Sequence, residues 1–176
     1  VNNDGKPDLY ICRHGAPNLL FVNQSGGRFL EQAAAFGLAI SDASVMGAFF
    51  DYDRDGWLDQ YLQTSLLGNS APQGQRDRLF RNNGNNTFTE VTDAMRLFGA
   101  TQGHAATWWD YDHDGWPDLY VGNDFLAPDQ LYKNVFGRGF AERADAAVPY
   151  FSHFSMGSDL GDVNNDGELD LFVADM

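Results

Sequence analysis

Aspartates recur in this chain at a spacing that could build a cation site. The pattern is D-x-[DN]-x-D-G-x-x-D, with acidic or amide side chains at positions 1, 3, 5 and 9 and glycine at position 6. Three copies are complete, at residues 51–59, 110–118 and 162–170, and a fourth copy at residues 1–8 starts at its second position. Two carboxylates 4 Å apart repel by roughly 4 kcal/mol at an effective dielectric constant near 20. A bound divalent cation would convert this repulsion into attraction.

Each position of the pattern has a predicted role in such a site. Side chains at positions 1, 3 and 5 would point at the ion, the glycine permits a sharp turn, and the carbonyl at position 7 and the carboxylate at position 9 complete the ring. Hard oxygen ligands in a flexible ring favour calcium over magnesium. We therefore predict Ca²⁺ as the cofactor, in three complete sites and a fourth site truncated at the N-terminus. The predicted metal-site residues are Asp51, Asp53, Asp55, Trp57, Asp59, Asp110, Asp112, Asp114, Trp116, Asp118, Asp162, Asn164, Asp166, Glu168, Asp170, Asn2, Asp4, Lys6 and Asp8.

The beginning of the pattern also fits an EF-hand, but the residues that follow do not. An EF-hand needs Glu at position 12 and a helix on either side of the loop. Position 12 is Leu62, Val121 or Val173 in the complete copies. The residues after position 9 are short aromatic and β-branched runs, which predict β-strands.

The rest of each repeat predicts three further strands. A segment of the form [ND]-x-L-[FY]-x-N, at residues 18–23, 77–82 and 129–134, is followed by a glycine-rich turn and a second short apolar run, as in a β-hairpin. Another apolar segment precedes each complete acidic loop, at residues 47–50, 105–109 and 156–160. The position-5 aspartates are 51, 59 and 52 residues apart, and the extra length of the second period falls in a predicted surface loop at residues 64–75.

Periods near 50 residues with four strands each are typical of β-propeller blades. We therefore predict an all-β fold in which residues 1–176 form a single partial β-propeller of about three four-stranded blades. Because closed propellers have about four to eight blades, we expect these residues to be an arc of a larger propeller, completed by further blades of the same full-length chain.

Charge and hydropathy exclude some classes of function. The chain has 25 Asp and Glu against 11 Lys and Arg, a net charge of −14, and 14 of its acids lie in the four loops. A basic surface that could neutralise phosphates is missing, so we predict no nucleic-acid partner. No run of 18 apolar residues is present, so we predict no membrane insertion.

Residues 82–92, 110–121 and 155–167 carry a resemblance to a known repeat family: N-N-G-N-N-T-F-T-E-V-T, D-Y-D-H-D-G-W-P-D-L-Y-V and S-M-G-S-D-L-G-D-V-N-N-D-G. By these phrases the chain resembles the FG-GAP or VCBS class of calcium-binding propeller repeats, and specifically the ASPIC/UnbV group related to cartilage acidic protein. The resemblance implies an integrin-like propeller of about seven blades and an extracellular, periplasmic or cell-surface location. The chain departs from the pattern where the first loop lacks its leading acid and where Asn164 replaces Asp.

Members of this class are mostly binding or scaffolding modules, so the resemblance implies a protein or glycan partner, with the propeller acting alone or as a subunit of a larger assembly. The alternative is the propeller domain of a secreted carbohydrate-active enzyme similar to polysaccharide lyases. The four histidines are scattered, and none has the spacing of a nucleophile, metal or acid–base motif. We therefore predict that the chain is not an enzyme and has no catalytic residues.

Overall fold

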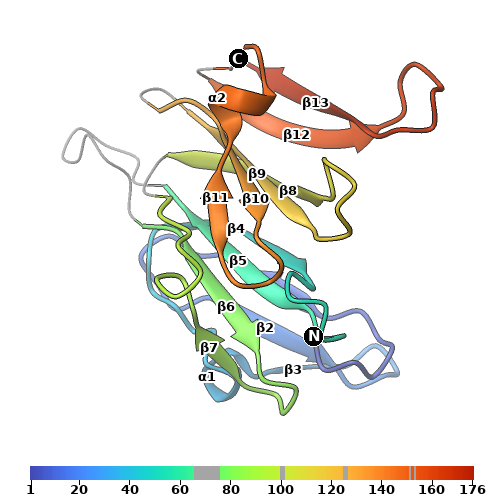
Figure 1. Ribbon diagram of the computed structural model, residues 1–176. Helices are drawn as coiled ribbons and strands as arrows, with labels where there is room; N and C mark the ends of the chain where they lie inside the picture. The colour runs from blue at the N-terminus through green and yellow to red at the C-terminus, as the bar shows by residue number, and fades with distance from the viewer. Residues whose placement is uncertain (66–75, 100–101, 125–126, 151, 153) are drawn as a thin grey trace.

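Antiparallel sheets follow one another along the chain and stack face to face (Figure 1). The computed structural model describes residues 1–65, 76–99, 102–124, 127–150, 152 and 154–176. Its strands are β1 (Leu9–Ile11), β2 (Leu19–Asn23), β3 (Phe29–Glu31), β4 (Ser44–Phe50), β5 (Asp59–Thr64), β6 (Arg78–Asn82), β7 (Phe88–Glu90), β8 (Gly103–Trp109), β9 (Asp118–Asn123), β10 (Gln130–Asn134), β11 (Phe140–Glu142), β12 (Ser155–Gly161) and β13 (Asp170–Asp175).

Two sheets have all four predicted strands, in the orders β4-β5-β6-β7 and β8-β9-β10-β11. Within the described residues the first sheet has three strands, β1-β2-β3, and the last has two, β12-β13. Every neighbouring pair is antiparallel, as expected for strands joined by short turns. The predicted all-β fold of four-stranded sheets is therefore confirmed, whereas the number of blades in a closed propeller stays a prediction.

The hydrophobic core lies between successive sheets. Leu20 and Val22 of the first sheet belong to one cluster with Leu62 and Phe80 of the second. A second cluster fills the space between the two four-stranded sheets, and a third lies between β9–β10 and β13. All six residues of β5 and of β9 are buried, because a sheet packs on both of their faces. Two-sided burial puts one apolar side chain on each face of β5, Tyr61 and Leu62, although the other four residues of this strand are polar.

Two short helices lie in the links between sheets, α1 (Ala33–Phe36) and α2 (Ala144–Ala147). Gly37 ends α1 in the left-handed region, at a φ of 80°, where its N–H bonds back to the helix. The long surface loop predicted at residues 64–75 falls for the most part outside the described residues.

A buried carboxylate binds the end of β5. Tyr61 Oη donates to Asp77 Oδ2 at 2.6 Å, and the Thr64 N–H donates to Asp77 Oδ1 at 2.7 Å. Loss of hydration raises the pKa of Asp77 to about 7, although the hydrogen bonds from Tyr61 and Thr64 lower it. In the first sheet Asn18 takes the same place, accepting from the Arg13 N–H at 2.7 Å and donating to the Tyr10 hydroxyl at 2.9 Å.

The raised pKa of Asp77 predicts a pH dependence of stability that Asp77→Asn removes. Because the folded pKa of about 7 lies above the ordinary value of 3.8, the stabilisation linked to this proton is complete below pH 4 and is lost as the pH rises through 7. The free energy of unfolding of Asp77→Asn, taken relative to that of wild type, should therefore be about 2 kcal/mol higher at pH 8 than at pH 5. Urea unfolding of both proteins at the two pH values measures this change; an equal difference at both would contradict it.

Candidate metal centres

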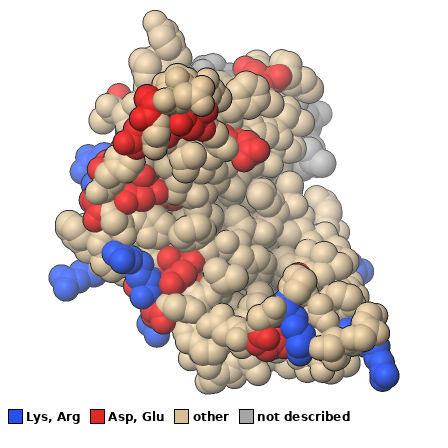
Figure 2. All heavy atoms as spheres, turned by 90° about the vertical axis from the view of Figure 1, so that its right-hand side faces the viewer, with Lys and Arg blue, Asp and Glu red and all other residues tan. Residues whose placement is uncertain are grey.

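The acidic loops lie on one side of the stacked sheets, at the right of Figure 1. Each complete loop joins the first two strands of a sheet, β4 to β5, β8 to β9 and β12 to β13. Position 9 is the first residue of the second strand and pairs with the residue just before position 1: Phe50↔Asp59, Trp109↔Asp118 and Gly161↔Asp170. Because the register repeats, the loops have equivalent places in successive sheets. Figure 2 shows acidic side chains gathered on this face.

Three carboxylates converge in each of two loops. One oxygen each from Asp51, Asp53 and Asp59 lie within 4.8 Å of one another, and so do oxygens of the equivalent Asp110, Asp112 and Asp118. Two oxygens bound to one Ca²⁺ at about 2.3–2.6 Å are separated by no more than about 5 Å. Positions 1, 3 and 9 of these two loops can therefore hold a metal ion.

The position-1 aspartate also holds the loop backbone in its turn. Asp51 Oδ1 accepts from the Asp55 N–H at 3.0 Å and Asp51 Oδ2 from the Gly56 N–H at 2.9 Å. Asp110 and Asp162 make the same two bonds in their loops. Gly56 has a φ of 90°, in the region that favours glycine. The repeated pattern therefore encodes a turn in which the position-1 carboxylate satisfies the backbone donors at positions 5 and 6.

In loops 51–59 and 110–118 the position-9 aspartate is buried and ties the loop to another strand. Asp118 Oδ2 accepts from the Tyr111 N–H at 3.2 Å and Asp118 Oδ1 from the Asn134 N–H at 2.7 Å. Asp59 accepts in the same way from Tyr52 and from Asn82. Loss of hydration raises the pKa of Asp59 to about 7 and that of Asp118 to about 6, against these bonds. The predicted ligands at position 9 are thus also structural acceptors.

The sequence comparison fits this geometry. A family model described as FG-GAP-like repeat matches residues 1–62, 66–121 and 110–173. The chain belongs to the FG-GAP-like repeat family. The search of curated proteins found no match, and the narrower resemblance to the ASPIC/UnbV group stays a prediction. Among the described residues, no helix is long and apolar enough to cross a membrane.

Positions 5 and 7 of the FG-GAP loops have contacts that the sequence did not predict. Asp55 and Asp114 stand outside the two three-carboxylate groups, and each accepts from the position-7 N–H of its own loop. The side chain at position 7 covers the next hairpin turn: a Cβ on Gly84 would lie 3.1 Å from the ring of Trp57. The equivalent Trp116 ring lies against Gly137. The predicted metal ligand at position 7 is the backbone carbonyl, so the indole rings of Trp57 and Trp116 are free to pack on these glycines.

The truncated and the last FG-GAP loop both have Asn at position 3, Asn2 and Asn164. Asp8 accepts from the N–H of Asn23 in β2 at 2.8 Å, as Asp118 does from Asn134, and Asp170 keeps the bond within its own loop, from the Val163 N–H at 3.0 Å. The other predicted residues of these two loops form hydrogen bonds within their own loop: Asp4, Lys6, Asp162, Asp166 and Glu168. Glu168 also contacts His113 of the neighbouring loop.

A lysine from a neighbouring strand reaches the carboxylates of loop 110–118. Lys133 Nζ bonds to Asp112 Oδ2 and lies 3.0 Å from Asp114 Oδ2. Although partial desolvation raises it, the pKa of Asp114 is lowered overall by the hydrogen bond from Lys133. In loop 51–59 the equivalent Arg81 stays 3.7 Å from Asp53. An ion binding in loop 110–118 would have to displace the Lys133 ammonium group from Asp112. In loop 51–59 the more distant Arg81 would compete with the ion only weakly.

The last residue of [ND]-x-L-[FY]-x-N links neighbouring FG-GAP repeats, a role that its repetition could have indicated. Asn134 Nδ2 donates to the Pro117 carbonyl of its own loop at 3.0 Å and to the Tyr52 carbonyl of the preceding loop at 2.8 Å. Its Oδ1 accepts from the Gly137 N–H at 2.8 Å. Asn82 makes the equivalent contacts one repeat earlier. These asparagines fix the spacing between successive acidic loops.

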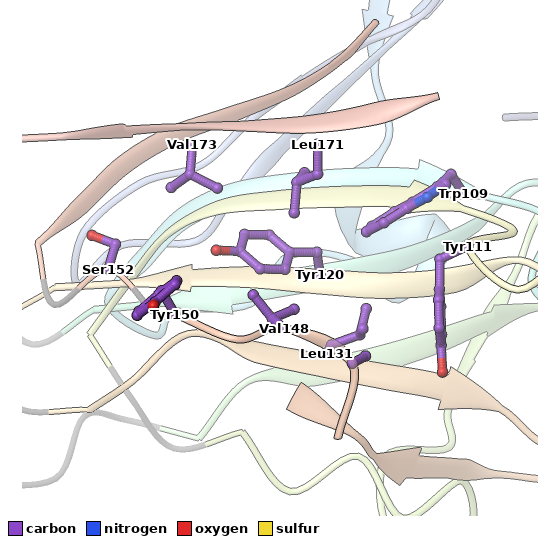
Figure 3. A pocket seen from close by; sticks show the side chains of 10 residues that line it. Trp109, Tyr111, Tyr120, Leu131, Val148, Tyr150, Ser152, Leu171 and Val173 are labelled. Carbon is purple, nitrogen blue, oxygen red and sulfur yellow. The ribbon is translucent and has the colours of Figure 1, made fainter. Parts of the chain in front are cut away.

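A separate apolar pocket lies between the sheet β8–β11 and β12–β13 (Figure 3). Tyr120 and Leu131 face Leu171 and Val173 across it, and Trp109 closes one end. The described lining residues are aromatic or aliphatic apart from Ser152, so they present no carboxylate, imidazole or thiol for acid–base chemistry. This pocket is therefore unrelated to the chemistry of the acidic loops.

Proposed function

We propose that the chain is part of a calcium-stabilised, extracytoplasmic β-propeller that acts as an interaction or scaffold module for a protein or glycan. The observation that carries the proposal is the convergence of three carboxylates at equivalent places in two successive FG-GAP repeats. Asp51, Asp53 and Asp59 would hold one ion, and Asp110, Asp112 and Asp118 a second. The ion would neutralise carboxylates that otherwise repel one another at the turn between two strands.

Calcium is the cation that this donor set favours, because the ligands are carboxylate oxygens in a flexible loop. Sites in extracellular modules bind Ca²⁺ at about 0.1–1 mM, so they fill outside the cytosol and stay largely empty within it. This supports an extracellular, periplasmic or cell-surface location. Loop 162–170 is proposed as a third, weaker site, since neutral Asn164 replaces a carboxylate there.

The proposed role is interaction, because the carboxylates are committed to loop structure and to the ion. Asp51, Asp59 and Asp118 each accept two backbone N–H bonds, which leaves little freedom for proton transfer to a substrate. The net charge of −14 disfavours nucleic acid as the partner. That the chain is not an enzyme, and that a carbohydrate-active enzyme is the alternative, stay predictions.

Removing calcium should destabilise the protein. In 10 mM CaCl₂, a site with a dissociation constant of about 0.1–1 mM is filled at about 10–100 times that constant and adds about 1.4–2.7 kcal/mol, which in a chain of this size raises the melting temperature by about 3–10 °C. Thermal unfolding followed by circular dichroism in millimolar CaCl₂ and in EDTA measures this shift. MgCl₂ at the same concentration as CaCl₂ controls for ionic strength, and it should raise the melting temperature less than CaCl₂ does. The same melting temperature in CaCl₂ and EDTA would contradict the proposal.

A further inference from the structure

The fourth residue of one acidic loop contacts the glycine turn of the next. Asn3 Nδ2 donates to the Gly56 carbonyl at 2.8 Å. One repeat later, Arg54 Nη1 donates to the Gly115 carbonyl at 2.9 Å. Donor and acceptor stand at positions 4 and 6 in both cases, so the contact recurs in the same register between successive sheets.

Loops 110–118 and 162–170 are also linked through position 4, but by a contact between two side chains. His113, again at position 4, places Nε2 2.8 Å from Oε2 of Glu168 at position 7 of the last loop. Arg54 makes a second contact of this kind, since its guanidinium carbon lies 5.4 Å from the ring centre of Trp116, also at position 7. The four loops thus form one continuous line across the sheets.

The backbone at position 4 is the same in every loop. Its φ lies between 55° and 60° in Asn3, Arg54, His113 and Asn165, although none of them is glycine. Residues other than glycine adopt this left-handed region uncommonly. With the backbone in this conformation, the side chain at position 4 reaches the neighbouring loop, as the contacts of Asn3, Arg54 and His113 show.

We propose that Arg54 is a positioning residue that couples the two neighbouring calcium sites. An ion in loop 51–59 orders Arg54, which holds the Gly115 carbonyl and so lowers the entropy cost of ordering loop 110–118 around its own ion. The turn at Gly115, which Arg54 contacts, is also stabilised by a bond within loop 110–118, where the Trp116 N–H donates to Asp114 Oδ1 at 3.0 Å. This inference rests on the proposed calcium binding.

The coupling can be measured with a variant that empties only the first site. Asp53→Ala removes one predicted ligand of loop 51–59 and leaves loop 110–118 intact. In a calcium titration followed by NMR, the amide signals of Gly56 and Gly115 report the two loops separately. We expect Asp53→Ala to raise the calcium concentration at the midpoint for Gly115 by about fivefold, at the low end for coupled sites because Arg54 is exposed.

Two substitutions at position 54 separate the hydrogen bond from the charge. Arg54→Gly and Arg54→Asn both remove the guanidinium, and both residues tolerate a positive φ. Only asparagine can donate, as Asn3 does at the same position. Asp53→Ala should therefore leave the Gly115 midpoint unchanged in the Arg54→Gly background and raise it about fivefold again in the Arg54→Asn background.

The outcomes distinguish the coupling from the calcium binding on which it rests. If calcium shifts neither glycine signal in the wild-type protein, both the proposed function and the coupling are overturned. If calcium shifts both signals but Asp53→Ala leaves the Gly115 midpoint unchanged, the coupling alone is overturned. An equal effect of Asp53→Ala in the Arg54→Gly and wild-type backgrounds would overturn the role of Arg54.

Discussion

Asp118→Ala is expected to destabilise the protein by about 3–5 kcal/mol without calcium, and by more in its presence because a proposed ligand is lost as well. Asp118 is fully buried and accepts N–H groups from two segments, the loop at Tyr111 and strand β10 at Asn134. Alanine would leave both donors without an acceptor, and hydrogen bonds to a charged group contribute about 1.5–3 kcal/mol each. Relief from burying a carboxylate whose pKa is raised to about 6 offsets part of this loss.

Asp112→Ala is the matched control for Asp118→Ala. Asp112 belongs to the same carboxylate group, and its contact outside the loop is the ion pair with Lys133. Its loss should therefore remove only the stabilisation that calcium adds and change stability in EDTA by less than about 1 kcal/mol. Urea unfolding in CaCl₂ and in EDTA measures both effects. If Asp118→Ala were destabilising only in CaCl₂, position 9 would be a ligand without the structural role described above.

Asn134→Ala should cost about 3 kcal/mol, because the side chain makes three buried hydrogen bonds. Alanine would leave the Tyr52 and Pro117 carbonyls and the Gly137 N–H without these partners. The bond to Tyr52 joins two sheets, so its loss also loosens the packing of one blade on the next. Chemical unfolding measured by tryptophan fluorescence gives the change in the free energy of unfolding.

Asn23→Ala provides the comparison within the same chain. Asn23 holds the equivalent place in the first sheet, where it bonds to the Pro7 carbonyl and the Ser25 N–H. It is only partly buried, and these two bonds lie within its own repeat. We expect a loss of about 1 kcal/mol. Similar losses for Asn23→Ala and Asn134→Ala would show that the bond between sheets contributes little.

The strands and the acidic loops could be predicted because their signals are local. The glycine at position 6 and the apolar run after position 9 act within a few residues, and both recur in every repeat. The antiparallel pairing of β5 with β6 and of β9 with β10 follows from the same repetition. Helix α2 (Ala144–Ala147) was not predicted, because four residues carry too little periodicity to mark a helix.

The repetition of the asparagine could have indicated that it has a role, but the partners that complete the site could not be predicted, because they lie far apart in sequence. The Asn134 N–H reaches Asp118 across 16 residues, and its side chain reaches Tyr52 across 82. Lys133 enters the carboxylate group from β10, whereas the first sheet has Val22 at the same position. Such contacts depend on how far successive sheets are offset, which the spacing of aspartates within one loop does not determine.

The most direct test of calcium binding by the acidic loops is X-ray diffraction from crystals grown in millimolar calcium, collected at a long wavelength where calcium scatters anomalously. The account predicts anomalous peaks in loops 51–59 and 110–118, each about 2.3–2.6 Å from oxygens of the aspartates at positions 1, 3 and 9. In loop 110–118 the Lys133 ammonium should have moved away from Asp112. Anomalous maps without peaks at both loops, with Lys133 still on Asp112, would contradict it.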